Sequence, residues 1–213
     1  MLVVVFCRGL AAALVLGLVA PAPASELDDV RSTELRLADW LRVAPGDRPW
    51  FVAGFALGWH GEAPATPPLA LAETLAAQAP VIAALDRRAG LADAANPRLA
   101  VLLLRAAAAG RLPPPAPSGD DWLGLDPSRR FALLSGFHGG SYARALWRGL
   151  DGAADAAALD AAFAGARRRV RPWLALAPSL LFARLSDYYF ITDRQDEPLL
   201  VSIRTIVDEV RAP

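Results

Sequence analysis

Residues 39–58 read DWLRVAPGDRPWFVAGFALG, and residues 121–140 read DWLGLDPSRRFALLSGFHGG. The two stretches share eight residues at a constant offset of 82, the offset that takes Trp40 to Trp122. Self-similarity at a fixed spacing is typical of a duplicated structural unit. The sequence therefore predicts two copies of one unit, each opened by a tryptophan turn and followed by a helix that contains glycine.

The rest of the composition favours helices over strands. Ala, Leu and Arg, which are strong helix formers, are abundant, and no run of alternating β-branched residues is bounded by turn residues as a strand requires. Capping residues that precede a proline mark expected helix starts at Thr66-Pro67, Asn96-Pro97 and Asp126-Pro127. We therefore predict an all-α fold of two tandem helical repeats, related by a pseudo-twofold axis, plus a C-terminal helix.

Four segments are expected along the chain. They are a signal peptide over residues 1–24, a first helical repeat over 25–110, a proline-rich linker over 111–119, and a second repeat with the C-terminal helix over 120–213. The linker sequence RLPPPAPSG contains too much proline for a helix and is typical of a stiff extended segment.

Helix signals place the individual helices within these segments. The glycine-containing helices are expected over about 48–59 and 127–148. Another helix begins near Pro67, and Pro80 is expected to break or kink it. Further helices are expected over about 97–109, 153–170 and, from an apolar stripe at helical spacing, 199–210.

The duplication extends beyond the opening phrase. Arg88 lies nine residues before Pro97, and Arg169 lies nine residues before Pro178. The offset there is 81, so we expect Pro97-Arg98-Leu99 to correspond to Pro178-Ser179-Leu180. On that alignment, the chain from Asp187 onward lies largely outside the second copy.

The first residues are typical of an export signal. Residues 9–20 read GLAAALVLGLVA, Arg8 precedes them, and Ala22-Pro23-Ala24 supplies a small-x-small cleavage site. We expect cleavage near Ala24 and a periplasmic or secreted protein. The alternative is an uncleaved anchor in the inner membrane, although Arg8 interrupts the roughly 20 apolar residues that a spanning helix needs.

Charge and cysteine content exclude several classes of function. The 22 basic residues, all of them arginine, balance 22 acidic residues, which gives no electrostatic basis for nucleic-acid binding. The absence of lysine excludes a Schiff-base enzyme. Cys7, the only cysteine, leaves with the signal peptide, so the exported chain has no disulfide and no cysteine ligand. We predict no cofactor and no metal.

The repeated residues are expected to pack the two copies together. Gly54 and Gly58, like Gly136 and Gly140, are four residues apart and share one helix face, where the missing Cβ lets another backbone approach. We expect the two helices to cross at these glycines. Trp40 and Trp122 are expected to be buried anchors, with an aromatic binding platform as the alternative.

His60 and His138 are the chain's only histidines. His138 lies in GFHGGSY, which resembles the His-Gly-Gly oxyanion loop of lipase-like esterases, but the Gly-x-Ser-x-Gly elbow is absent. His60-Gly61-Glu62 matches half of a zinc-deaminase signature whose cysteines are missing. A cap or surface role is expected for both histidines. The alternative is that one of them acts with a carboxylate in a hydrolase-like periplasmic enzyme.

Two further clusters are candidate binding residues. Arg168 and Arg169 belong to a basic run that complements the dipole of the preceding helix, or that binds an anionic group. Tyr188 and Tyr189 precede an acidic loop, where they pin the last helix to the core or form a recognition edge.

The tryptophan turn with Gly-Phe-x-x-Gly, and the segment Tyr188-Tyr189…Asp193…Pro198-Leu199…Ile203, are similar to motifs of small exported helical proteins of Gram-negative bacteria, most of them uncharacterised. More distantly, the glycine helix resembles that of the immunity proteins that neutralise amidase toxins of type VI secretion. The resemblance implies an exported helical protein and carries over no catalytic residue.

The sequence as a whole favours a non-enzymatic binding protein with a protein partner in the cell envelope. No nucleophile–base pair, metal-ligand pattern or phosphate loop is present in the sequence. Two alternatives stay open: the histidine-dependent enzyme, and a structural subunit of an envelope complex that is membrane-bound only if residues 1–24 remain uncleaved.

Overall fold

The computed structural model describes residues 33–61, 67–91, 96–150, 155–165 and 176–211, and these residues fold into helices without a strand. The all-α prediction is therefore confirmed for this part of the chain. The elements in chain order are η1 (Leu37–Arg42), α2 (Arg48–His60), α3 (Leu71–Gly90), α4 (Leu99–Ala108), α5 (Gly119–Gly124), α6 (Pro127–Gly149), α7 (Ala156–Gly165), α8 (Pro178–Thr192) and α9 (Leu199–Arg211).

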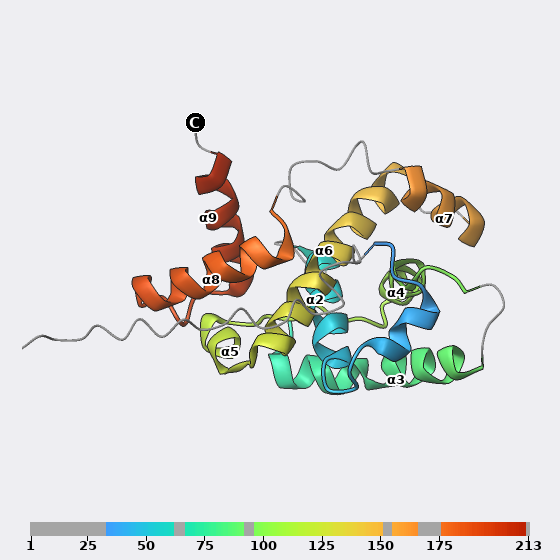
Figure 1. Ribbon diagram of the computed structural model, residues 1–213, viewed down its shortest axis with the longest axis horizontal. Coiled ribbons are helices and arrows are strands. Elements are labelled where there is room, and N and C mark those ends of the chain that lie inside the picture. Colours follow the sequence, from blue (N-terminus) through green and yellow to red (C-terminus); the bar gives the residue numbers. More distant parts are fainter. Residues whose placement is uncertain (1–32, 62–66, 92–95, 151–154, 166–175, 212–213) are drawn as a thin grey trace, which may run out of the picture.

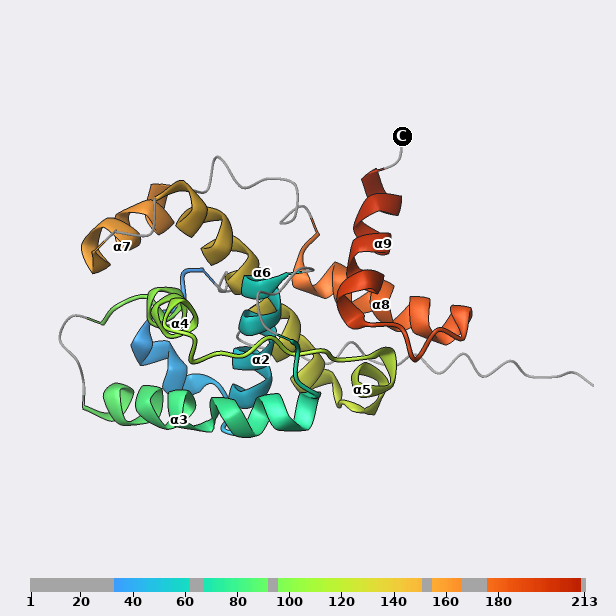
Figure 2. The same cartoon turned by 180° about the vertical axis from the view of Figure 1, so that it is seen from behind.

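Helices α2 and α6 pack against each other at the centre of the molecule. On one side of this pair lie α3 and α4, and on the other side lie α5, α8 and α9 (Figures 1 and 2). Helix α7 follows α6 and packs against α4. Its Asp160 pairs with Arg98 at 2.9 Å and with Arg36 at 3.3 Å, which joins α7 to the N-terminal half.

Glycines set the closeness of the α2–α6 contact. A Cβ on Gly54 would overlap the carbonyl oxygen of Leu133, and a Cβ on Gly136 would overlap that of Phe51. Leu133 and Phe51 are themselves related by the offset of 82. The two contacts are therefore equivalent: the glycine of each helix lies against the backbone of the other helix, at residues that correspond at the offset of 82.

The second glycine pair behaves in the same way. A Cβ on Gly58 would overlap the carbonyl oxygen of Phe137, and a Cβ on Gly140 would overlap that of Phe55. Because the contact moves forward along both helices together, α2 and α6 run in the same direction. Backbones that come this close leave no room for side chains at these four positions.

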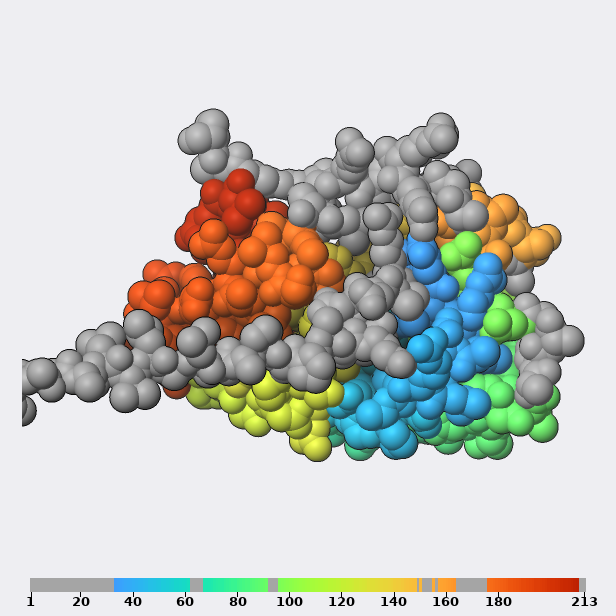
Figure 3. Space-filling model, viewed as in Figure 1, coloured from blue at the N-terminus to red at the C-terminus, as the bar shows by residue number. Residues whose placement is uncertain are grey.

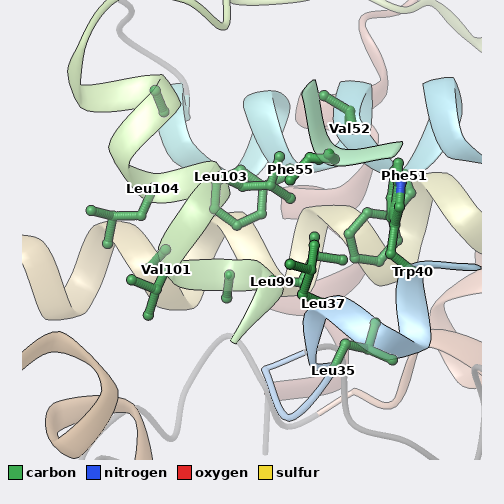
Figure 4. Close-up of a cluster of buried hydrophobic side chains, with 14 of the residues drawn as sticks. Leu35, Leu37, Trp40, Phe51, Val52, Phe55, Leu99, Val101, Leu103 and Leu104 are labelled. Carbon is green, nitrogen blue, oxygen red and sulfur yellow. The ribbon is translucent and has the colours of Figure 1, made fainter. Parts of the chain in front are cut away.

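Two apolar clusters lie on either side of this central pair. The first gathers buried residues of η1, α2 and α4, including Trp40, Phe51, Phe55 and Leu103 (Figure 4). The second gathers residues of α6, α8 and α9 around Trp122. Helix α2 faces both clusters, and Phe51 through Gly58 are all buried. A helix that is apolar on every side belongs in a protein interior.

The proline-rich segment is extended, but it is not a free spacer between two units. Leu112 is fully buried. The segment also forms a bridge with Leu69, whose N–H donates to the carbonyl of Pro114 at 2.9 Å and whose carbonyl accepts from Ala116 at 3.0 Å. The segment therefore packs as part of the core.

Helix starts and interruptions differ from the predictions in three places. Asp126 caps α6 as expected, because its side chain accepts from the N–H of Arg129 at 3.0 Å. Asn96 does not cap α4, and its side-chain oxygen instead accepts from Ala38 at 2.9 Å. Helix α3 begins only at Leu71, and it continues through Pro80 without ending there, so the predicted break is wrong.

In the first half, the start of α4 is hydrogen-bonded to the start of η1. The N–H of Leu37 donates to the carbonyl of Pro97 at 2.9 Å, and the N–H of Leu99 donates to the carbonyl of Leu35 at 2.8 Å. These two bonds form an antiparallel bridge that brackets the Trp40 turn.

The same pair of bonds recurs in the second half. The N–H of Gly119 donates to the carbonyl of Glu197 at 3.1 Å, and the N–H of Leu199 donates to the carbonyl of Pro117 at 2.8 Å. Here the start of α9 pairs with the start of α5, and an antiparallel bridge forms again.

The recurring bonds relate the halves by two offsets. Leu37 corresponds to Gly119 at an offset of 82, and Leu99 corresponds to Leu199 at an offset of 100. The predicted correspondence of Leu99 with Leu180 is therefore wrong. The sequence signal failed because the segment that contains α7 shifts the register between the two offsets. Helix α9 begins with the same kind of bridge as α4, so the start of α9 does not lie outside the second set of elements.

Candidate functional site

A tryptophan and an arginine form a buried corner at the start of the first half. Trp40 is fully buried, and its indole Nε1 donates to Oδ1 of Asp86 on α3 at 2.6 Å. The same oxygen accepts from Nη1 of Arg48 at 3.0 Å. The Arg48 guanidinium lies 5.5 Å from the centre of the Trp40 ring, within the range of a cation–π contact. One carboxylate oxygen therefore satisfies both donors.

The second half holds the same two donors in the same arrangement. Trp122 is fully buried, and the Arg130 guanidinium lies 5.4 Å from the centre of its ring. Nη2 of Arg130 donates to the carbonyl of Leu123 at 2.8 Å, as Nη2 of Arg48 does to Leu41 at 3.4 Å. Neither tryptophan offers an exposed ring face as a platform.

The two corners differ in their acceptor. Within the described part of the chain, the buried atoms Trp122 Nε1 and Arg130 Nε have no hydrogen-bond partner. Desolvation lowers the pKa of Arg130, and the charge of Asp126 offsets part of this effect. A buried indole N–H without an acceptor loses its hydrogen bond to water and gains nothing in return.

Helix α8 carries different residues at the positions that match Asp86 and its neighbours. At the offset of 100, Asp86 corresponds to Ser186 and Ile82 corresponds to Phe182. The Phe182 ring packs edge-on against Trp122 with a centroid separation of 5.7 Å. The Ser186 hydroxyl donates to the carbonyl of Phe182 at 2.9 Å, within its own helix. The second half thus has the same two donors but no carboxylate at the matching position.

Tyr188 and Tyr189 belong to a hydrogen-bond network that fastens α8 to α9. The Tyr189 hydroxyl donates to Ser202 at 2.8 Å, and Ser202 donates to Glu197 at 2.7 Å. The Tyr188 hydroxyl donates to the same Glu197 oxygen at 2.7 Å and accepts from Arg194 at 3.2 Å. The network fixes the turn between the two helices.

Burial and hydrogen bonding shift the pKa values of this network. Desolvation raises the pKa of Tyr189 to about 12, so its hydroxyl stays protonated and can donate. Desolvation alone would raise the pKa of Glu197, but the hydrogen bonds from Ser202 and Tyr188 and the charge of Arg194 outweigh it. The pKa of Glu197 therefore lies below its usual value, and its carboxylate is the acceptor of the network.

Beyond the network, the end of α8 exposes two large apolar side chains. Phe190 is 88% exposed and Ile191 is 77% exposed, the highest exposures among the large apolar residues that the structure describes in the second half. Helices α8 and α9 form one end of the molecular surface, in orange and red in Figure 3. We refer to Phe190 and Ile191 together as the apolar tip.

The two histidines occupy different surroundings. His60, at the end of α2, lies 2.7 Å through Nε2 from the carbonyl of Leu112. His138 is buried inside α6, so the cap or surface role expected for it is wrong, and desolvation lowers its pKa to about 4. Its Nε2 has no hydrogen-bond partner within the described ranges. Burial therefore keeps the His138 imidazole neutral, and no acidic residue in the described ranges is hydrogen-bonded to it.

Some sequence predictions fall outside the described residues. These are the Arg168–Arg169 run, the signal peptide and the end of the helix expected over 153–170. Within the described ranges, no three side chains of His, Cys, Asp or Glu come together as a metal site. Searching the same ranges finds no helix with the length and apolarity needed to cross a membrane.

Sequence reasoning missed Asp86, Glu197 and Ser202. Asp86 lies 46 residues from Trp40 along the chain, and nothing local distinguishes it from other helix-surface acids. Ser202 stands within an apolar stripe, where its single hydroxyl is the only available signal. Arg48 and Arg130 recur in the repeated phrase at the offset of 82, but no donor role was predicted for them or for the tryptophans.

Comparisons of the chain with protein-family models, with curated proteins and with solved structures return no match.

Proposed function

We propose that this chain is an exported, non-enzymatic binding protein of the cell envelope, and that the apolar tip on α8 contacts a protein partner. The proposal includes the architecture: two copies of one unit, η1-α2-α3-α4 and α5-α6-α8-α9, with α7 inserted in the second copy. The observation that carries the function is the exposure of Phe190 and Ile191.

The recurring contacts support the duplication. The glycine contacts between α2 and α6 are reciprocal, and the bridge of α4 to η1 recurs as the bridge of α9 to α5. The offsets of 82 and 100 together relate the four helices of each unit. Two copies packed through α2 and α6 leave the remaining helices of each copy on opposite sides.

The tip is presented by a turn that is already ordered, which supports a binding role. The Tyr188–Glu197 hydrogen bond closes the turn, and Thr192 donates to the carbonyl of Tyr188 at 2.6 Å. Ordering before binding reduces the entropy lost on association. Aromatic side chains are enriched in protein–protein interfaces, and an exposed aromatic side chain does not stabilise the fold of the chain that carries it.

The matching tip of the first half gives an internal control. At the offset of 100, Phe190 corresponds to Gly90 and Ile191 corresponds to Leu91. Leu91 is 81% exposed, but it has no aromatic neighbour at position 90. We assign partner binding to the α8 tip because the aromatic residue is present only there.

The test is site-specific cross-linking in living cells. An ultraviolet-activated cross-linking amino acid at position 190 is expected to give one discrete adduct in the envelope fraction. The same amino acid at position 91 is expected to give none. Ile191→Ser, introduced together with the cross-linker at position 190, is expected to weaken the adduct, and Leu91→Ser is expected to leave it unchanged.

Equal adducts from positions 91 and 190, or no adduct from either, would contradict the proposed role of the tip. The identified partner then has to bind the purified chain, and Phe190→Ser has to reduce that affinity. Because the tip is exposed, Phe190→Ser is expected to change the stability by less than about 0.5 kcal/mol. A loss of binding is then not a loss of folding.

Export is tested separately by the mass of the chain after expression in a Gram-negative host. Cleavage near Ala24 is expected, which releases a chain that begins at Ser25. A periplasmic chain of full-length mass would instead support the inner-membrane anchor and the role as a subunit of an envelope complex.

A further inference from the structure

The Asp86 corner of the first half is a binding site for a carboxylate that the chain itself supplies. A single oxygen of Asp86 accepts from Trp40 Nε1 at 2.6 Å and from Arg48 Nη1 at 3.0 Å. The Asp86 side chain is 40% exposed, whereas that of Arg48 is 11% exposed. The acceptor position therefore lies nearer the surface than its donors, since Trp40 is fully buried and Arg48 is largely covered.

The second corner repeats the donors at that position. Trp122 and Arg130 are placed as Trp40 and Arg48 are, with ring-to-guanidinium distances of 5.4 Å and 5.5 Å. No partner within the described residues accepts from Trp122 Nε1 or from Arg130 Nε. Of these two atoms, only Trp122 Nε1 matches a donor to Asp86, because Arg48 Nε donates to the carbonyl of Val43 at 3.0 Å. Ser186, which matches Asp86, is bonded to its own helix and does not reach toward the pair.

Two donors of this kind favour a carboxylate over other acceptors. A guanidinium and an indole N–H are donors only, so they bind an acceptor that brings negative charge. Their positions are fixed by packing, since Trp122 is fully buried and Arg130 is held by Leu123. A carboxylate that enters removes the penalty of an unpaired buried N–H as well as forming charge-assisted bonds.

We propose that the Trp122–Arg130 corner binds a carboxylate group from another molecule in the place that Asp86 occupies in the first half. One oxygen accepts from Trp122 Nε1 and from the Arg130 guanidinium. The ligand is either a small free carboxylate or an acidic residue of a peptide. This site is separate from the apolar tip, so the proposal of carboxylate binding does not depend on the partner proposed for the tip.

The test follows the indole N–H resonances of the full exported chain, labelled with ¹⁵N-tryptophan, during titration. The probes are acetate, N-acetyl-aspartate amide and N-acetyl-asparagine amide, with chloride at matched ionic strength as the control. Trp122→Phe and Trp40→Phe variants assign the two resonances. A saturable downfield shift of Trp122 with a carboxylate, and none of Trp40, is the expected result.

The three probes distinguish the source of the carboxylate. Saturation by acetate alone indicates a small free carboxylate, and tighter saturation by the aspartate amide indicates a peptide ligand. The asparagine amide is expected to leave Trp122 unmoved. Arg130→Gln is expected to weaken the binding about tenfold or more, because it removes the charge-assisted bond. No saturable shift with any carboxylate, or an equal shift with chloride, would overturn the proposal.

A second variant supplies the carboxylate from within the chain. Ser186→Asp is expected to shift the Trp122 resonance downfield, to abolish its response to acetate, and to raise Tm by about 3 °C. In the Trp122→Phe background the same substitution is expected to give no gain in Tm. If Ser186→Asp raised Tm equally in both backgrounds, or left the response to acetate intact, the matching of Ser186 with Asp86 would be wrong.

Discussion

Each half of this protein places an arginine guanidinium against a buried tryptophan ring with the same geometry. The halves differ in the acceptor that these two donors bond to. In the first half, Asp86 accepts from both Trp40 and Arg48. In the second half, Trp122 has no acceptor within the described residues, and the matching residue is Ser186. The same pair of donors is thus completed by an acceptor of the chain in the first half and, within the described residues, lacks that acceptor in the second half.

The halves also differ at the outer ends of α3 and α8. The first half ends α3 with Gly90 and Leu91, whereas the second ends α8 with Phe190 and Ile191 beside a network of tyrosines. Features that could contact other molecules therefore gather in the second half. In the first half, Asp86 accepts from Trp40 and position 90 is a glycine, although Leu91 is exposed as Ile191 is.

The largest expected effect comes from the glycines that the halves share. Gly54→Ala forces a Cβ into the backbone of α6, and Gly136→Ala forces one into α2. Because the backbone of neither helix can shift easily, each substitution is expected to lower the free energy of unfolding by about 3 kcal/mol in urea denaturation. Similar losses of stability from both variants would support the reciprocal contact of α2 and α6. A loss from only one variant would contradict it.

Gly90→Ala is the matched control for the glycine variants. A Cβ there meets nothing within 4 Å, and the position lies at the end of α3. Alanine is expected to leave the stability unchanged or to raise it by about 0.5 kcal/mol, since it restricts the unfolded chain. A loss as large as that of Gly54→Ala would show that close packing is not the cause.

The next largest effect concerns His138, which stands in α6 where α2 has Ala56. Its pKa falls from 6.5 to about 4 in the folded chain. The full stability is therefore present above pH 6.5. As the pH falls from 6.5 toward 4, the unfolded chain binds a proton that the folded chain resists, and about 3 kcal/mol is lost.

Unfolding measured in urea between pH 7 and pH 4 tests this dependence. His138→Ala, which restores the first-half residue, is expected to flatten the acid arm of the curve, and His60→Ala is expected to keep it. Comparison with the parent chain at each pH removes the contribution of carboxyl groups that titrate nearby. An unchanged slope in His138→Ala would place the titrating group elsewhere.

A smaller effect is expected for the difference in stability between the Trp40→Phe and Trp122→Phe variants. Trp40→Phe loses the bond to the Asp86 carboxylate, whereas Trp122→Phe loses no hydrogen bond within the described residues. Both substitutions leave a comparable cavity, so the difference between them isolates the bond. Thermal or urea unfolding is expected to show that Trp40→Phe is more destabilising by about 2 kcal/mol. Equal losses would mean that Trp122 has an acceptor after all.

The smallest expected effect is the loss of stability on removing the hydroxyl groups of Tyr188 and Tyr189, which the first half lacks. At the offset of 100, Tyr189 corresponds to Ala89. Tyr189→Phe removes a buried bond to Ser202 and is expected to cost about 1 kcal/mol, whereas Tyr188→Phe removes a more exposed bond and is expected to cost less. Urea unfolding measures both. A larger loss from Tyr188→Phe would reverse the assigned order of burial.

The sequence predicted those parts of the fold that depend on residues close together in the chain. The helical composition gave the all-α class, and Asp126-Pro127 gave the start of α6. The opening phrase gave α2 to within one residue, since the helix ends at His60. These signals are local because a cap, a proline or a glycine acts on the turn in which it stands.

Other features depend on contacts between distant residues, and the sequence did not predict them. The relation of α4 to α9 is hidden because the stretch that contains α7 changes the offset from 82 to 100, and the shared residues are mostly apolar. Pro80 did not end α3, because packing of the helix against η1 and α2 outweighs the loss of one hydrogen bond. The pairing of Asp86 with Trp40 required knowing which face of α3 is buried.

The most direct test of the central claim compares the indole N–H resonances of Trp40 and Trp122 in the ligand-free chain. Trp40 is predicted to resonate downfield, as a short bond to a carboxylate requires, and Trp122 is predicted to resonate upfield of it. Asp86→Asn is predicted to move Trp40 upfield and to leave Trp122 in place. Coincident resonances, or a shift of Trp122 in Asp86→Asn, would contradict the claim that the two halves share their donors and differ in their acceptor.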